Sequence, residues 1–237
     1  MQSENKSTHT KTYFDLPKGV IIEYLLTFLK ECLISFKEGR LSLHSKEKLS
    51  DAKENFYTIQ LVNYLTDQQR DKERNRKGEK DNIFVSFNFM NQDDSSDRIK
   101  IKGVNPTMDI RIYLPHQPNY IFDIEAKRLY NKNLRAYVAG VTGGIERFKR
   151  NSHGQGLNQS AILGYIEIEN FNFWYNKINT WLKEEATKTS DLNWIDTELL
   201  KDLVIVEDNL AESSSLHGRL EGEPIKLIHL WVDLIDR

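Results

Sequence analysis

The stretch Met108–Tyr130, MDIRIYLPHQPNYIFDIEAKRLY, decides the fold that we expect for this chain. It predicts two short strands, and the polar turn residues His116–Asn119 between them favour a hairpin. A hairpin that folds about Gln117 places Asp109 opposite Glu125, because both residues are equally far from Gln117 along the chain. Directly opposed residues on one sheet face have Cβ atoms roughly 4.5–5.5 Å apart.

The second strand of this hairpin carries further charge on the same face. Alternation along a strand puts Asp123, Glu125 and Lys127 on one side. An exposed cross-strand ion pair is the simplest alternative, but the apolar neighbours Ile124 and Ala126 indicate a central strand, where buried charges need a reason. Two adjacent carboxylates repel each other, and a hard divalent cation between them removes that repulsion.

The composition favours one α/β domain with peripheral additions. The chain has 237 residues, a single cysteine at Cys32 and a formal charge of −2. One cysteine excludes an intrachain disulfide framework and fits a reducing cytoplasm. The N-terminus is too polar for a signal peptide, and no apolar run is long enough to span a membrane. The charge is not that of a protein that holds nucleic acid by bulk electrostatics, so local patches, a metal or a partner must contribute.

Hydrophobic periodicity predicts an order of helices, a three-strand meander, helix, strand, helix and terminal strands. This order predicts an α/β fold with a mixed central sheet flanked by helices. We expect a tail and helical extension over residues 1–44 and the main domain over 45–237. The expected helices cover 18–37, 45–69, a segment ending near 150, and 171–186, and the expected strands cover 83–89, the hairpin, 157–168, 203–207 and 225–234. The charged run 70–80 is expected to be a solvated loop.

An acid on one strand and Glu-x-Lys on the next, after a helix that carries Glu54, resembles the PD-(D/E)XK nuclease superfamily, which has the restriction-endonuclease-like fold. The motif reads PTMD at 106–109 and EAK at 125–127, with the proline three positions before the aspartate instead of one. The segments GGIERFKR, NQSAILGYIEI and LHGRL…PIKLIHLWVDL are similar to bacterial nuclease-like proteins that accompany anti-phage defence systems. The resemblance covers roughly residues 45–237.

The resemblance implies roles for particular residues. Asp109 and Glu125 would bind Mg²⁺, for which Mn²⁺ can substitute, and the backbone carbonyl of Ala126 would be a third ligand. Lys127 would orient or deprotonate the attacking water and offset charge at the phosphate. Glu54 would be the helical acid that supports the metal.

Contacts to the nucleic acid are expected from a basic rim. The candidate residues are Arg111, Arg147, Lys149, Arg150, His217 and Arg219. Each has an ordinary alternative: Arg111 can pair with Asp123, the cluster near residue 150 can be a solvated helix end, and His217 can be a surface-loop histidine. On the helix, Glu47 and Asp51 are rivals of Glu54.

The resemblance implies a Mg²⁺-dependent DNA nuclease that acts in bacterial anti-phage defence, and the single cysteine fits a cytoplasmic location. The resemblance implies a subunit that works with an ATPase- or helicase-like partner or as a homo-oligomer. Two alternatives stay open. One is a non-catalytic nucleic-acid-binding or scaffold subunit of the same fold, and the other is a metal-dependent RNase.

Overall fold

The computed structural model of the chain describes residues 16–41, 53–76, 84–91, 108–115, 119–140 and 143–235. Within these ranges the strands form a seven-stranded mixed sheet in the order β1-β2-β3-β4-β7-β6-β5. The strands are β1 (Asn88–Asn91), β2 (Ile110–Tyr113), β3 (Tyr120–Leu129), β4 (Gln159–Ile166), β5 (Val204–Glu207), β6 (Leu210–His217) and β7 (Ile225–Asp233). The predicted α/β class with a mixed central sheet is confirmed.

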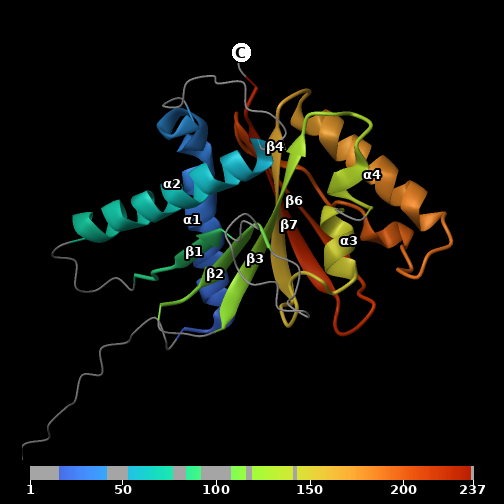
Figure 1. Cartoon of the computed structure of the whole chain (residues 1–237), viewed down its shortest axis with the longest axis horizontal. Coiled ribbons are helices and arrows are strands. Elements are labelled where there is room, and N and C mark those ends of the chain that lie inside the picture. Colours follow the sequence, from blue (N-terminus) through green and yellow to red (C-terminus); the bar gives the residue numbers. More distant parts are fainter. Residues whose placement is uncertain are drawn as a thin grey trace, which may run out of the picture.

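Helices cover both faces of the sheet (Figure 1). They are α1 (Lys18–Gly39), α2 (Lys53–Asn75), α3 (Gly144–Lys149) and α4 (Phe171–Ala186), with 3-10 turns η3 (Arg135–Tyr137) and η4 (Asp196–Glu198). On one face Leu25 of α1 and Leu61 of α2 are buried with Ile124 of β3, and on the other Trp174 of α4 is buried with Ile162 of β4. Because α1 shares its core with the sheet, it is part of the same layered structure; the boundary at residues 44 and 45 stays a prediction.

The strand pairing confirms the predicted hairpin register. β1, β2 and β3 form an antiparallel meander, and Ile110 faces Ile124 while Arg111 faces Asp123. Both pairs are equidistant from Gln117, which itself lies outside the described residues. After β3 the chain crosses over through η3 and α3 and returns as β4, parallel to β3.

The charged run 70–80 differs from the expectation of a loop. Helix α2 continues to Asn75, and the remaining residues 77–80 lie outside the described part. Arg, Lys, Gln and Glu are good helix formers, and the ion pairs Arg70–Asp67 and Arg74–Asp71 link successive turns. The described part of this run is exposed to solvent, as predicted, but it is helical and not a loop.

Two strands also differ from the sequence reading. β1 begins at Asn88, and the described residues 84–87 before it are not in a strand. The Ser-rich segment that we expected to link the last two strands contains strand β6. Its serines alternate on a pleated surface, and Ser213 and Ser215 are buried against β7. Among the described helices, none combines the length and the apolar character needed to cross a bilayer.

A glycine in β4, Gly164, allows close packing between strands. A Cβ atom added to Gly164 would lie 2.5 Å from Cδ1 of Trp231, which is too close for any ordinary contact. The absence of a side chain therefore lets Trp231 of the neighbouring strand β7 pack across β4, next to Leu129 of β3.

Candidate active site

The candidate site lies along β3 where β2 no longer covers it. The pairing of β2 with β3 reaches Ile124, whereas β3 pairs with β4 on its other edge as far as Leu129. Two carboxylates take the place of the missing strand. Asp109 accepts a hydrogen bond from the backbone N–H of Ala126 (2.7 Å), and Glu54 accepts one from that of Arg128 (2.9 Å). The structure therefore brings the helical acid and the β2 acid to the same edge of β3.

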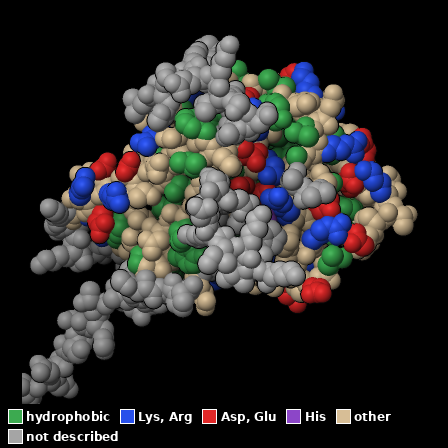
Figure 2. Space-filling view, viewed as in Figure 1, with side chains coloured by type: hydrophobic (Ala, Val, Ile, Leu, Met, Phe, Trp, Pro, Cys, Tyr) green, Lys and Arg blue, Asp and Glu red, His purple; other side chains and the backbone are tan. Residues whose placement is uncertain are grey.

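Lys127 lies among the oxygens that were predicted to bind a metal. Its Nζ is 2.7 Å from Oε1 of Glu125, 2.8 Å from the carbonyl oxygen of Ala126 and 3.4 Å from Oε1 of Glu54. The side chains of Glu125 and Lys127 are 0% and 8% exposed. Figure 2 shows acidic and basic side chains gathered near the middle of this face of the molecule. The ammonium group thus occupies a position that oxygen ligands surround.

The two predicted carboxylate ligands differ in how readily they ionise. Burial and the neighbouring charge of Glu125 raise the pKa of Asp109 to about 7. Burial also acts to raise the pKa of Glu125, but the charges of Lys127 and Arg147 and the nearby His153 outweigh it and lower the pKa to about 2. Glu125 is therefore ionised at neutral pH, while Asp109 retains a proton in part of the molecules until another positive charge arrives.

Arg147 and His153 complete the surroundings of Glu125. Nη1 of Arg147 donates to Oε1 of Glu125 (2.7 Å), and Nε2 of His153 lies 3.1 Å from Oε2. Arg147 was predicted at the nucleic-acid rim, and His153 was not predicted at all. The sequence holds no signal for His153, because only the crossover from β3 through α3 brings residues 147–153 back to β3.

The remaining candidates at the rim are held by protein groups. Arg111 forms an ion pair with the buried Asp123 (3.0 Å), which is the alternative that the sequence left open. Burial raises the pKa of Asp123 despite this partner. Arg150 pairs with Glu146 and Asp191 on the surface. Arg219 is half-buried, and its Nη2 donates to the carbonyl oxygen of Gly154 (2.9 Å).

The prediction that Lys149 and His217 contact nucleic acid is wrong. Both side chains are fully buried. Lys149 donates to both carboxylate oxygens of Glu198 at 2.7 Å, because α3 turns this residue toward the core and Arg147 toward the site. His217 lies on an inner position of β6, which the sequence reading took for a loop.

His217 belongs to a chain of buried hydrogen bonds that crosses β6 and β7. Nε1 of Trp231 donates to the hydroxyl of Tyr137 (2.8 Å), which lies 2.8 Å from Nδ1 of His229. The hydroxyl of Ser215 lies 2.7 Å from Nε2 of both His229 and His217. Ser215 and His217, with Glu198 3.5 Å from the ring, are the residue types of a hydrolytic triad, but Ser215 is 1% exposed, so no substrate reaches it. The network is structural.

The buried histidines predict a loss of stability in acid. Burial lowers the pKa of His217 below the ordinary value of 6.5 and lowers the pKa of His229 well below it. The unfolded chain therefore takes up protons below pH 6.5 at these histidines that the folded chain does not. This contribution to the free energy of unfolding falls as the pH is lowered, whereas the raised pKa of Asp109 acts in the opposite direction. Each histidine contributes up to about 1.4 kcal/mol per pH unit.

The free energy of unfolding, measured by urea unfolding from about pH 7.5 down to about pH 5, checks this expectation. His229→Gln should remove about one histidine's share of the slope. Ser215→Ala breaks the same network but keeps both histidines, so it should lower stability at every pH and leave the slope in place. Equal slopes in His229→Gln and the wild type would contradict the assignment.

The donor set at the edge of β3 suits a hard divalent cation. Asp109, Glu125 and the carbonyl of Ala126 supply oxygen ligands, which Mg²⁺ prefers. Buried Oε2 of Glu125 accepts no hydrogen bond of good geometry, although His153 is near, so it has a lone pair to spare. Within the described ranges, no three His, Cys, Asp or Glu side chains are already clustered as a metal site.

No protein-family model, curated protein or solved structure matches the chain.

Proposed function

We propose that the chain is a Mg²⁺-dependent nuclease of the PD-(D/E)XK superfamily that cleaves DNA phosphodiesters. The observation that carries this proposal is the gathering of Asp109, Glu125 and Lys127 at one edge of β3. Asp109 accepts a hydrogen bond from the N–H of Ala126, and Nζ of Lys127 contacts Glu125 and the Ala126 carbonyl oxygen. The topology supports it: a helix with a site acid, an antiparallel meander, and a crossover helix leading to a parallel strand. A surface ion pair does not explain the buried carboxylate of Glu125 next to the half-buried Asp109.

The residues divide the work by position. Asp109, Glu125 and the Ala126 carbonyl would hold the cation, which supplies charge for the developing oxyanion and lowers the pKa of bound water. Lys127 orients the attacking water and offsets negative charge at the phosphate. Glu54 fixes the strand edge through the N–H of Arg128 and keeps Lys127 within reach of the site.

The biological setting extends the same proposal. The resemblance of its segments, which rests on the sequence alone, suggests a role in bacterial defence, and an unregulated DNase would be toxic to its host. The charge of −2 does not by itself attract DNA. An ATPase- or helicase-like partner, or a second copy of the chain, would bring the substrate and gate the cleavage.

Incubation of the purified protein with plasmid, linear DNA and RNA tests the reaction. We expect DNA cleavage in Mg²⁺ or Mn²⁺, none in EDTA, and a loss of about 100-fold or more in Asp109→Asn. Asp202→Asn is the matched control, because Asp202 is an exposed aspartate away from β3. Cleavage of RNA but not of DNA would favour the alternative hypothesis of a metal-dependent RNase. Undiminished cleavage by Asp109→Asn would refute the site.

A non-catalytic scaffold of the same fold is the second candidate. Lys127 favours it in one respect, since a permanent ammonium–carboxylate contact stabilises the strand edge without a metal. In that case wild-type protein would cleave nothing in any cation, and Asp109→Asn would change stability alone.

A further inference from the structure

Glu125 has more positive partners than one carboxylate needs. Its Oε1 accepts from both Lys127 and Arg147, each at 2.7 Å, while its Oε2 faces His153. The positive charges of Lys127 and Arg147 repel each other on this oxygen. Their shared contact with Glu125 is therefore favourable only while no further cation binds the carboxylate. A divalent cation bound to Glu125 would neutralise the carboxylate, so that Glu125 would no longer need both Lys127 and Arg147 as partners.

Arg147 is the partner that is free to leave. Its side chain is 26% exposed, whereas those of Lys127 and His153 are 8% and 0% exposed. Lys127 is also tied to the Ala126 carbonyl and to Glu54. The planar guanidinium of an arginine binds phosphate through paired hydrogen bonds and stays charged at any working pH.

His153 keeps Glu125 in place when Arg147 moves. Its ring packs edge-on against Phe148, and its Nδ1 lies 2.8 Å from the carbonyl oxygen of Ser152, so the orientation of the ring is fixed from within its own loop. Nε2 lies 3.1 Å from Oε2 of Glu125 and also 3.3 Å from Nη1 of Arg147, and the contacts within the loop hold the ring beside Glu125 when the contact with Arg147 is lost.

We infer that Arg147 exchanges Glu125 for a backbone phosphate of DNA when a divalent cation occupies Asp109 and Glu125, so that DNA and the cation bind cooperatively. The inference rests on the proposed function and adds the order in which the site is filled. Without a cation, Glu125 competes with DNA for Arg147. Binding free energies are reciprocal, so DNA must tighten cation binding by the same factor.

Fluorescence anisotropy of a labelled DNA duplex tests the coupling without relying on turnover. Ca²⁺ serves as the cation, because it binds oxygen ligands and allows binding to be measured apart from cleavage. We expect saturating Ca²⁺ to tighten DNA binding by the wild type roughly tenfold. Arg147→Met should clearly reduce this factor, leaving only the coupling that comes from contact between the cation and the phosphate itself. In parallel, Mn²⁺ binding by electron paramagnetic resonance should show the same factor on adding DNA to the wild type.

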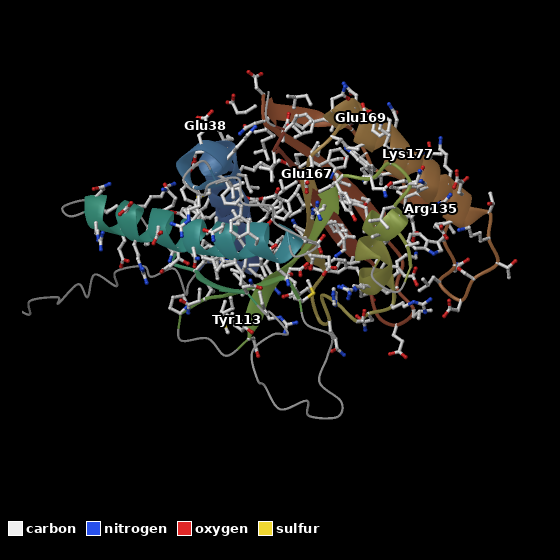
Figure 3. All side chains as sticks on the ribbon, turned by 45° about the horizontal axis from the view of Figure 1, so that its top comes forward. Glu38, Tyr113, Arg135, Glu167, Glu169 and Lys177 are labelled. Carbon is white, nitrogen blue, oxygen red and sulfur yellow. The ribbon has the colours of Figure 1, made fainter. Side chains whose placement is uncertain are left out.

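The control is Arg135→Met. Arg135 of η3 is also paired with carboxylates, but its partners Glu184 and Glu185 lie on α4, beside which Figure 3 labels Arg135. It should keep the full coupling. A Ca²⁺ effect of the same size in Arg147→Met would overturn the inference, as would a wild type whose DNA affinity ignores Ca²⁺. In either case Mn²⁺ binding that disappears in Asp109→Asn would leave the proposed metal site standing, so the two failures are distinguishable.

Discussion

Lys127→Met is expected to abolish cleavage and at the same time to tighten Mn²⁺ binding. The cleavage rate should fall by about 100-fold or more, because the group that offsets charge at the phosphate is removed. Binding should tighten, because the ammonium group that now contacts Glu125 and the Ala126 carbonyl no longer competes for these oxygens. Plasmid cleavage and Mn²⁺ titration followed by electron paramagnetic resonance measure the two effects separately.

Asp109→Asn is the matched comparison for this variant. It should also abolish cleavage, but it should weaken Mn²⁺ binding, since it removes a ligand charge instead of a competitor. Opposite changes in metal affinity with the same loss of activity would identify Lys127 as the occupant of the cation position. If Lys127→Met bound Mn²⁺ more weakly than the wild type, Lys127 would help to position the metal ligands and would not compete with the cation.

Lys149→Met is expected to have the largest effect on stability. Lys149 and Glu198 form a fully buried ion pair, and the loss of one partner leaves an uncompensated charge in the core. Burial acts to raise the pKa of Glu198, but the nearby His217 and the hydrogen bonds from Lys149 outweigh it and lower the pKa, so the carboxylate is charged in the folded protein. The free energy of unfolding should fall by about 3–5 kcal/mol.

Urea unfolding at neutral pH checks this value. Lys188→Met removes an exposed lysine from its pair with Glu185, which keeps Arg135 as a partner, and should cost about 1 kcal/mol or less. The double variant Lys149→Met with Glu198→Gln should recover part of the loss, because glutamine is neutral and still accepts the hydrogen bond from the N–H of Gly218. A Lys149→Met variant as stable as Lys188→Met would contradict the buried pair.

The hairpin and its register were predictable because strand alternation and turn chemistry are local. Ile110 faces Ile124 as the symmetry about Gln117 requires, and α4 covers the predicted residues. The extension of α2 through the charged run was missed because a run without apolar residues carries no period from which to recognise a helix. Strand β6 was missed because serines weaken the alternating pattern of its inner face.

The candidate site was predictable only where its residues are close in sequence. Asp109, Glu125 and Lys127 follow from one hairpin. The placement of Glu54 needed the family resemblance, because a helix end has no local signal for what it touches. The sequence could not show which of Arg147, Lys149 and His153 lies at the site. The rotation of the six-residue helix α3 decides that Arg147 faces Glu125 and Lys149 faces Glu198.

The central claim is a divalent-cation site on the open edge of β3, and a crystal soaked in Mn²⁺ tests it most directly. Anomalous diffraction should place one ion at about 2.1 Å from carboxylate oxygens of Asp109 and Glu125 and from the Ala126 carbonyl oxygen, with Nζ of Lys127 displaced. Lys127 still in contact with Glu125, and no ion within about 3 Å of either carboxylate, would contradict the account.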